Sequence, residues 1–424
     1  MPKMKMDLII RTGTAMKLHR LALWTGMGSG LEYYAFISFA LQANALSLVF
    51  FHHSNSALTQ TFFIFAAGSI MTLMGGFFLG WLGDALGRKK ILLLSISLMT
   101  VATVMIGLLP THLPYGLSIV LLILCRLIQG ISVGSEIPGA MIFVYEHAHK
   151  NKVGFLMGIL FLGIGLGAGV STGVNALVST FFTPKQILDF AWRIPFLLAF
   201  FLGAAGYLLR RNSSEPPAFE TYLAQQRQHS IQRIHLPFKL ILKGAGLILF
   251  PATLVSVGLY LPSYWINQAT QAPHAVFLAL MFGFLISALL LPLFGKISDH
   301  FGRKQVYCCG AILSLVILPV LMHLLTLNIS WGLYLFNLMY YLLIVIMASC
   351  YPAMLAGLFA IPLRYRCVAL SYSGTYAVAG TLPFLVSLAI QHGSHPRLLL
   401  LFLLIIGCIS LYSGLKYFNP HSGT

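Results

Sequence analysis

Three ionisable side chains stand inside long apolar stretches of this sequence, namely Glu32, Arg126 and Glu136. A charge within an apolar environment is costly, so a residue of this kind usually has a partner and a function. A carboxylate can take up and release a proton there, whereas an arginine keeps its charge and must pair with an anion. The three residues therefore predict proton transfer and anion binding inside an apolar protein.

Glu32 and Glu136 are the candidates for proton coupling. Tyr33 and Tyr34 flank Glu32 with side chains typical of a cavity, although Glu32 can also be a structural partner of a helix end or a polar group. Glu136 lies about 15 Å beyond Arg126 along a helix, at 1.5 Å per residue. It can relay a proton along that helix or hold a basic loop as part of a gate.

Arg126 is the candidate for binding a substrate carboxylate through its forked guanidinium. The alternative is a pairing inside the protein, with Glu32 or a tyrosine, and the two pairings can alternate. Polar and aromatic side chains complete the expected substrate site: Tyr33, Tyr34, Gln129, Tyr260, Tyr264, Tyr341 and Tyr372. No hydrolase motif, nucleotide-binding loop or metal-ligand spacing occurs, so we expect no enzyme activity, no metal and no cofactor.

The composition indicates which elements hold these residues. Only 8% of the 424 residues are charged and 58% are hydrophobic, whereas soluble proteins contain about 25% charged residues. Uncharged runs such as 91–109 and 398–415 approach the roughly 20 residues that a membrane-spanning helix needs. We predict about twelve such helices, over 20–50, 57–82, 91–110, 115–147, 153–181, 190–210, 240–267, 274–296, 305–326, 331–361, 367–391 and 397–417.

The charge distribution predicts the orientation of these helices. Most of the 26 lysines and arginines fall in the loops on one side of the membrane, together with both termini. Cytoplasmic loops carry such an excess of basic residues, so we expect both termini in the cytoplasm. The formal net charge of +17 is explained by this bias, and we expect no binding of nucleic acid.

A charged sequence occurs twice in the chain. "GWLGDALGRKK" (80–90) and "GKISDHFGRKQ" (295–305) match at five of eleven positions. The repeat predicts a duplicated six-helix unit, with one helical bundle over 1–209, a cytoplasmic linker over 210–239 and a second bundle over 240–424.

Each copy of the repeat pairs an acid with a base one helical turn later, Asp84 with Arg88 and Asp299 with Arg303. One interpretation is a cytoplasmic gate of breakable ion pairs between the bundles. The alternative is that these charges only anchor the topology and that the glycines only form tight turns.

The two charged copies resemble the signature loop of the major facilitator superfamily. Three further stretches resemble its metabolite:proton symporter family: "RLIQGISVGSEIPGA" (126–140), "EHAHKNKVGFLMG" (146–158) and "RYRCVALSYS" (364–373). The resemblance implies two six-helix bundles around a cavity that opens alternately to each side. It also implies proton-coupled import of small carboxylates, amino acids or betaines across a bacterial inner membrane. Ala35 stands where the family usually has an aspartate, so the protein would either rely on Glu32 for coupling or couple differently.

We therefore expect a secondary active transporter, monomeric and multi-pass in the inner membrane, that uses a proton gradient to take up a small polar metabolite. The alternative is proton-driven efflux of a hydrophobic compound or siderophore.

Glycines spaced four residues apart within 153–181 predict close helix packing there.

Overall fold

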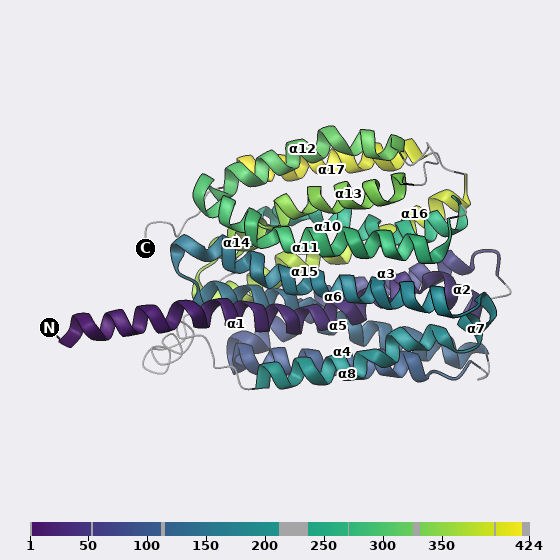
Figure 1. The fold of residues 1–424 in the computed structure, drawn as a ribbon, viewed down its shortest axis with the longest axis horizontal. Coiled ribbons are helices and arrows are strands. Elements are labelled where there is room, and N and C mark those ends of the chain that lie inside the picture. The colour runs from purple at the N-terminus through teal and green to yellow at the C-terminus, as the bar shows by residue number, and fades with distance from the viewer. Residues whose placement is uncertain are drawn as a thin grey trace.

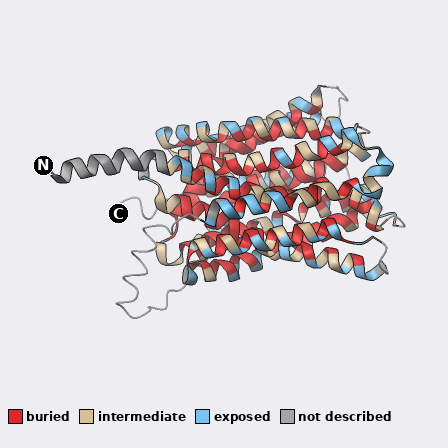
Figure 2. Cartoon of the chain, turned by 60° about the horizontal axis from the view of Figure 1, so that its bottom comes forward, coloured by how far each residue is buried: buried red, intermediate tan, exposed pale blue. Residues whose placement is uncertain are grey.

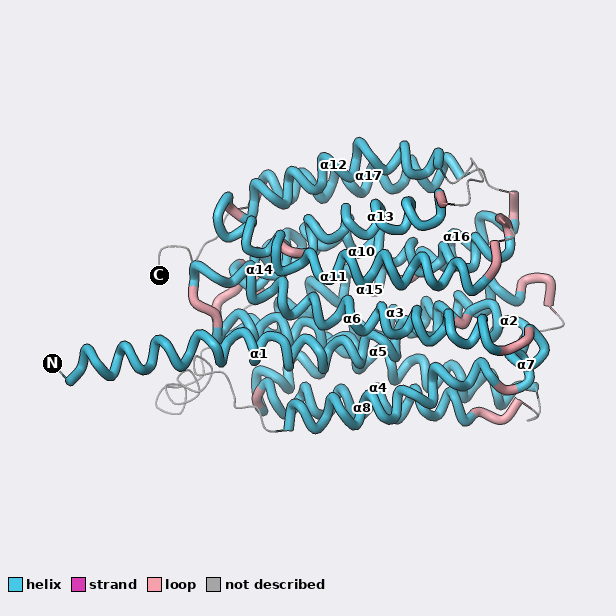
Figure 3. The backbone as a smooth tube through the Cα atoms, viewed as in Figure 1, coloured by secondary structure: helices cyan, strands magenta, loops and turns pink. Residues whose placement is uncertain are grey.

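The computed structural model describes the backbone of residues 2–51, 54–111, 115–211, 236–269, 271–324, 331–393 and 396–417. Every regular element within these ranges is helical (Figure 3). The side chains of residues 2–17, 84–85, 88, 115, 150, 209–210, 324 and 396–397 lie outside the description. The predicted gate residues Asp84 and Arg88 are among these.

The helices of the first half lie in the order of the chain: α1 (Pro2–Leu41), α2 (Ala43–Phe51), α3 (Ala57–Leu86), α4 (Arg88–Leu108), α5 (Tyr115–His147), α6 (Val153–Phe181), α7 (Pro184–Asp189) and α8 (Ile194–Arg211). The second half contains α10 (Phe238–Asn267), α11 (Pro273–Phe301), α12 (Arg303–Leu324), α13 (Gly332–Ala348), α14 (Tyr351–Gly357), α15 (Arg364–Ala379), α16 (Leu382–Gln391) and α17 (Pro396–Leu415). Short 3₁₀ turns precede α6, α8 and α15.

Eleven helices in the described part of the chain are long and apolar enough to cross a membrane, counting α13 with α14 and α15 with α16 as single spans. The pair α1 and α2, bent by 56° at its break, would supply one more. Large apolar side chains such as Phe63, Val101 and Phe181 are exposed, and exposed residues lie along the outer surfaces of the helices (Figure 2). The chain is a multi-pass membrane protein, as predicted.

Three of the predicted spans are broken: the span over 20–50 between α1 and α2, and two spans of the second half. The span predicted over 331–361 divides into α13 and α14, and Pro352 stands at the start of α14. The span predicted over 367–391 divides into α15 and α16, and Pro383 stands at the start of α16. Proline lacks a backbone N–H and its ring clashes with the carbonyl four residues earlier, which accounts for the two breaks of the second half.

The helices of the two halves lie as two groups, with α4 and α8 on one side and α12 and α17 on the other (Figure 1). The halves meet most extensively where α6 packs on α11 and where α3 packs on α15. Helix α1 begins and α17 ends at the same end of the helices, which we call the termini face. The opposite end is called the far face.

Glycines allow α6 to pack closely on two sides. Gly163 and Gly167 lie against Gly26 and Gly30 of α1, where a Cβ atom on any of the four would overlap the backbone of the other helix. Gly154 and Gly158 lie in the same way against the backbone of α11. The predicted packing role of these glycines is confirmed, and it places α1 and α11 on either side of α6.

Candidate functional site

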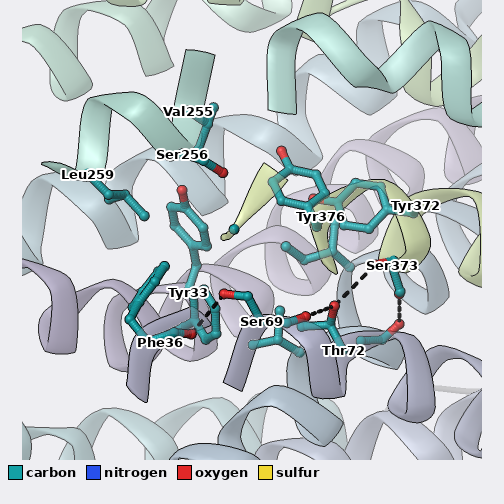
Figure 4. A pocket seen from close by; sticks show the side chains of 15 residues that line it. Tyr33, Phe36, Ser69, Thr72, Val255, Ser256, Leu259, Tyr372, Ser373 and Tyr376 are labelled. Carbon is teal, nitrogen blue, oxygen red and sulfur yellow. Dashed lines mark hydrogen bonds between the residues drawn. The ribbon is translucent and has the colours of Figure 1, made fainter. Parts of the chain in front are cut away.

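A narrow cavity lies between the two halves, about midway along the helices. Helices α1, α3 and α5 supply one wall, and α10 and α15 supply the other (Figure 4). The lining residues are Tyr33, Phe36, Phe65, Ser69, Thr72, Val133, Gly134, Ile137, Val255, Ser256, Leu259, Tyr372, Ser373, Tyr376 and Gly380.

The lining is aromatic and uncharged. The rings of Tyr372 and Tyr376 stack at 4.6 Å between centroids, and Tyr33 points toward Ser256 from the opposite wall (Figure 4). None of these fifteen described residues carries a formal charge. Aromatic faces attract organic cations, and serine and threonine hydroxyls donate or accept hydrogen bonds, so the lining offers both kinds of contact but no formal counter-ion.

Arg126 lies directly behind the cavity wall and is completely buried. Its guanidinium carbon is 4.2 Å from the ring centroid of Phe36, 4.4 Å from that of Phe65 and 4.8 Å from that of Phe39. Because Phe36 and Phe65 also line the cavity, their rings separate the guanidinium from it in this conformation.

The guanidinium of Arg126 is only partly hydrogen-bonded. Its Nη1 donates to the Phe36 carbonyl at 3.1 Å and to Gln129 Oε1 at 2.8 Å, one helical turn along α5. Its Nε and Nη2 have no hydrogen-bond partner among the described residues. Gly68 on α3 leaves room for this side chain, since a Cβ there would overlap it. Arg126 therefore has unsatisfied donors next to the cavity and makes no ion pair with a described residue.

Glu32 and Glu136 are brought together by Ser95 of α4. Ser95 Oγ lies 3.3 Å from Glu32 Oε1 and 2.7 Å from Glu136 Oε2. Ser29 donates to Glu136 Oε1 at 2.9 Å, and Ser132 Oγ lies 3.5 Å from Glu32 Oε2. All five residues are buried among α1, α4 and α5. Neither carboxylate lines the cavity.

The structure distributes the other predicted binding residues among several environments. Tyr33 and Tyr372 line the cavity. Tyr34 points away from it and donates to the Pro195 carbonyl of α8 at 2.7 Å. Tyr341 contacts Phe284 within the second half, with ring centroids 4.1 Å apart and ring planes inclined by 36°.

Two further predicted residues lie on α10, toward the far face. Tyr260 contacts the Phe62 ring of α3 at 5.3 Å between centroids, so it lies where the two halves meet. Tyr264 is half-buried one turn further along the helix, and neither side chain lines the cavity. Gln129 is also outside the cavity, because its amide donates to Thr103 at 2.7 Å.

Polar contacts join the halves at the termini face. Asp299 of α11 accepts hydrogen bonds from the backbone N–H groups of Gly154 at 2.8 Å and Phe155 at 2.9 Å, at the start of α6. Arg303 donates to the same carboxylate at 3.0 Å. The second copy of the charged repeat therefore contacts a helix N-terminus of the first half, an arrangement favourable to a carboxylate.

An ion pair that the sequence did not indicate also joins the halves at this face. Arg364 Nη1 lies 3.2 Å from Glu146 Oε1. Nearby, the Tyr365 hydroxyl donates to the Ser135 carbonyl at 2.9 Å. Glu146 and Arg364 stand at the starts of two stretches quoted above for their resemblance to a family, which was the signal available in the sequence.

The far face is joined as well. Thr59 of α3 forms hydrogen bonds of 2.9 Å with Ser387 and Gln391 of α16. Asn267 of α10 donates to the Asn44 side-chain oxygen of α2 at 2.8 Å. The two halves thus contact each other on both sides of the cavity.

Several cavity residues were not among the predicted site residues, in particular Phe65, Ser69 and Thr72 of α3 and Ser256 of α10. Ser69 and Thr72 are one helical turn apart in the otherwise apolar stretch 62–83 of α3, so their spacing was a usable signal. Phe65 offered none, because a phenylalanine in a membrane helix is ordinary.

The sequence matches a known family and known transporters. The model of the family described as "Sugar (and other) transporter" matches residues 21–233. A proline/betaine transporter of Escherichia coli (strain K12) is 30% identical over 421 residues, covering 94% of this chain and 83% of that protein. A glycine betaine/proline/ectoine/pipecolic acid transporter, OusA, of Dickeya dadantii (strain 3937) is 28% identical with the same coverage.

Solved structures share the fold. The proton:xylose symporter XylE of the major facilitator superfamily, bound to 6-bromo-6-deoxy-D-glucose, superposes with a TM-score of 0.78 at 17% identity, covering 95% of both chains. The inward open conformation of XylE from E. coli superposes with a TM-score of 0.71 at 18% identity, covering 96% of this chain and 98% of that one.

Proposed function

The chain belongs to the sugar (and other) transporter family of the major facilitator superfamily, and from this premise we propose that it imports a zwitterion of the proline or betaine type together with protons. Family membership makes the protein a membrane transporter and not an enzyme. The relatives named for proline and betaine transport support the choice of substrate class.

The observation that carries this proposal is the uncharged aromatic cavity between the halves. A zwitterion has no net charge, so it can enter a site that offers no counter-ion on its surface. Its ammonium group would contact the rings of Tyr33, Tyr372 and Tyr376, as quaternary ammonium groups do in aromatic cages.

The carboxylate of the same substrate would bind Arg126. The Nε and Nη2 donors of Arg126 face no described partner, and a forked guanidinium matches a carboxylate. The rings of Phe36 and Phe65 would move aside to let the two groups meet. The bound substrate would then contact the tyrosine rings of the cavity and, through its carboxylate, Arg126 of the first half.

Transport would proceed by relative movement of two bundles, 1–209 and 240–424, joined by the linker 210–239. We place the termini face in the cytoplasm of a cell whose inner membrane holds the protein as a monomer, because the basic residues gather on that side. Asp299 and Arg303 would form one part of the cytoplasmic gate, and Asp84 and Arg88 the corresponding part in the first half. Glu32 and Glu136 would carry the proton.

Flux measurements on purified protein in liposomes test this function. With an inwardly directed proton gradient, we expect labelled glycine betaine and proline to accumulate, and a protonophore to abolish that accumulation. Protein-free liposomes and labelled xylose serve as controls. Accumulation that survives the protonophore would contradict proton coupling, and net loss of substrate from loaded liposomes under the same gradient would indicate efflux.

A further inference from the structure

A proline inside α5 leaves one backbone carbonyl of this helix without its usual donor. In an α-helix each carbonyl accepts a hydrogen bond from the backbone N–H four residues later, but Pro138 has no N–H to give to Gly134. A carbonyl in an apolar interior needs a donor from elsewhere. The Ser373 hydroxyl of α15 donates to the Gly134 carbonyl. A side chain of the second half therefore bonds a backbone group that a proline has freed in the first half.

Ser373 differs from its neighbours on α15 in the acceptor that its hydroxyl uses. Serine and threonine in a helix commonly donate to the carbonyl three or four residues before them. Ser371 and Thr375 do so, at 2.9 Å to the Cys367 carbonyl and at 2.7 Å to the Ser371 carbonyl. Ser373 points toward α3 and α5 instead (Figure 4). Gly76 of α3 leaves room for it, since a Cβ there would lie 2.8 Å from Ser373 Oγ.

This contact lies at the side of the cavity that is nearer to the termini face. Gly134 and Ser373 both line the cavity, and Tyr372 and Ser373 are its first lining residues along α15, which begins at the termini face. Two turns closer to that face, the Tyr365 hydroxyl donates to the Ser135 carbonyl at 2.9 Å. Two hydroxyls of α15 thus bond consecutive carbonyls of α5, and both bonds would be lost if α15 moved away from α5.

We propose that the Gly134 carbonyl is the acceptor of a reversible latch between the halves. Ser373 donates to it while the cavity is closed toward the termini face, and water donates to it when the cavity is open there. Pro138 is the positioning residue, because it removes the donor of the helix itself in both conformations. On opening, the Ser373 hydroxyl can turn to the Ala369 carbonyl, four residues before it on α15. The inference rests on the proposed movement of the two bundles and not on the identity of the substrate.

The second half contains a similar arrangement within a single bundle. Pro251 of α10 leaves the Leu247 carbonyl without its usual helical donor, and the Tyr307 hydroxyl of α12 donates to this carbonyl at 2.7 Å. Because α10 and α12 both belong to the second half, the contact would stay intact during the proposed movement. It supplies a matched control, namely a carbonyl freed by a proline whose new donor does not cross between the halves.

The accessibility of the cavity from the termini face measures the latch. Ser256→Cys, on the α10 wall of the cavity, is the single cysteine in a full-length protein whose native cysteines are replaced, and an impermeant maleimide is added at the termini face without substrate. Ser373→Ala leaves the Gly134 carbonyl without this donor in the closed conformation, so we expect labelling to accelerate about tenfold. Tyr307→Phe removes the corresponding donor within the second half and should change the rate less than about twofold.

A double-mutant cycle tests the role of Pro138. Pro138→Ala places a backbone N–H at position 138, so the Gly134 carbonyl gains a donor from its own helix in both conformations. In this background Ser373→Ala should change the labelling rate less than about twofold. A similar acceleration by Ser373→Ala in both backgrounds, or no acceleration in either, would overturn the proposal. Because no substrate is added, a protein that shows the expected coupling but does not transport glycine betaine would contradict the proposed substrate class alone.

Discussion

The Arg364 guanidinium of the second half lies 3.2 Å from the Glu146 carboxylate of the first half, and the Glu146 side chain is completely buried. The pair joins residues 218 positions apart in the chain, close to the contact of Asp299 with the start of α6. These contacts hold the halves together at the termini face, so the proposed opening of the cavity toward that face would require them to break.

Replacing one member of this pair should favour the conformation open at the termini face. Removing one partner of a buried ion pair costs about 3–5 kcal/mol, so Glu146→Gln should populate the open state. A single cysteine introduced as Ser256→Cys in the cavity wall, in a protein whose native cysteines are replaced, then reports whether the cavity is accessible from the termini face. We expect its labelling by an impermeant maleimide, added at the termini face, to accelerate at least tenfold. The exchanged pair Glu146→Arg with Arg364→Glu should restore slow labelling, and equal rates in all variants would exclude the pair as a gate.

The glycine contact between α1 and α6 should be sensitive to a single methyl group. A Cβ at Gly167 would overlap the backbone of Gly30, and overpacking of this kind costs about 1–3 kcal/mol. We expect Gly167→Ala to lower the melting temperature in detergent. Gly116→Ala is the matched control, since nothing lies within 4 Å of the added atom. Equal melting temperatures for both variants would contradict close packing of these helices.

The ring of Tyr376, and not its hydroxyl, should contribute most to binding of glycine betaine. An aromatic face stabilises a quaternary ammonium group by about 1–2 kcal/mol when water is excluded. Tyr376→Ala should therefore raise the KM for uptake about tenfold, whereas Tyr376→Phe should change it little. Tyr412→Ala, at an exposed position on α17, controls for general effects. A phenylalanine variant as impaired as the alanine variant would argue against an aromatic cage.

Arg126 should distinguish substrates with a carboxylate from those without one. Lysine keeps the positive charge but lacks the planar fork that binds a carboxylate and stacks on rings. Competition with uptake of labelled proline measures this difference. Arg126→Lys should raise the inhibition constant of glycine betaine about tenfold and leave that of choline, which has no carboxylate, unchanged. Equal weakening of both competitors would indicate that Arg126 serves only the structure of the first half.

The sequence predicted the helices well because membrane spans are encoded locally. Long uncharged runs identified the spans, and the four-residue glycine spacing on α6 identified a packing surface. The burial of Glu32, Arg126 and Glu136 followed from their apolar neighbours in the chain.

The direction and partners of side chains were much harder to predict. Tyr33 and Tyr34 are adjacent, but successive helical residues point about 100° apart, so one lines the cavity and the other bonds α8. The rings around Arg126 come from α1 and α3, and Ser95 comes from α4. Such neighbours depend on how separate helices pack, which no local pattern in the sequence specifies.

Proton coupling is tested most directly by measuring the pH inside liposomes while substrate enters. Glycine betaine is added outside with no pH or electrical gradient imposed, and an enclosed dye reports the internal pH. The wild type should acidify the interior as labelled substrate enters, and Glu32→Gln, in liposomes preloaded with unlabelled glycine betaine, should admit labelled substrate by exchange without acidification. Entry of glycine betaine through the wild-type protein at constant internal pH would contradict proton-coupled transport.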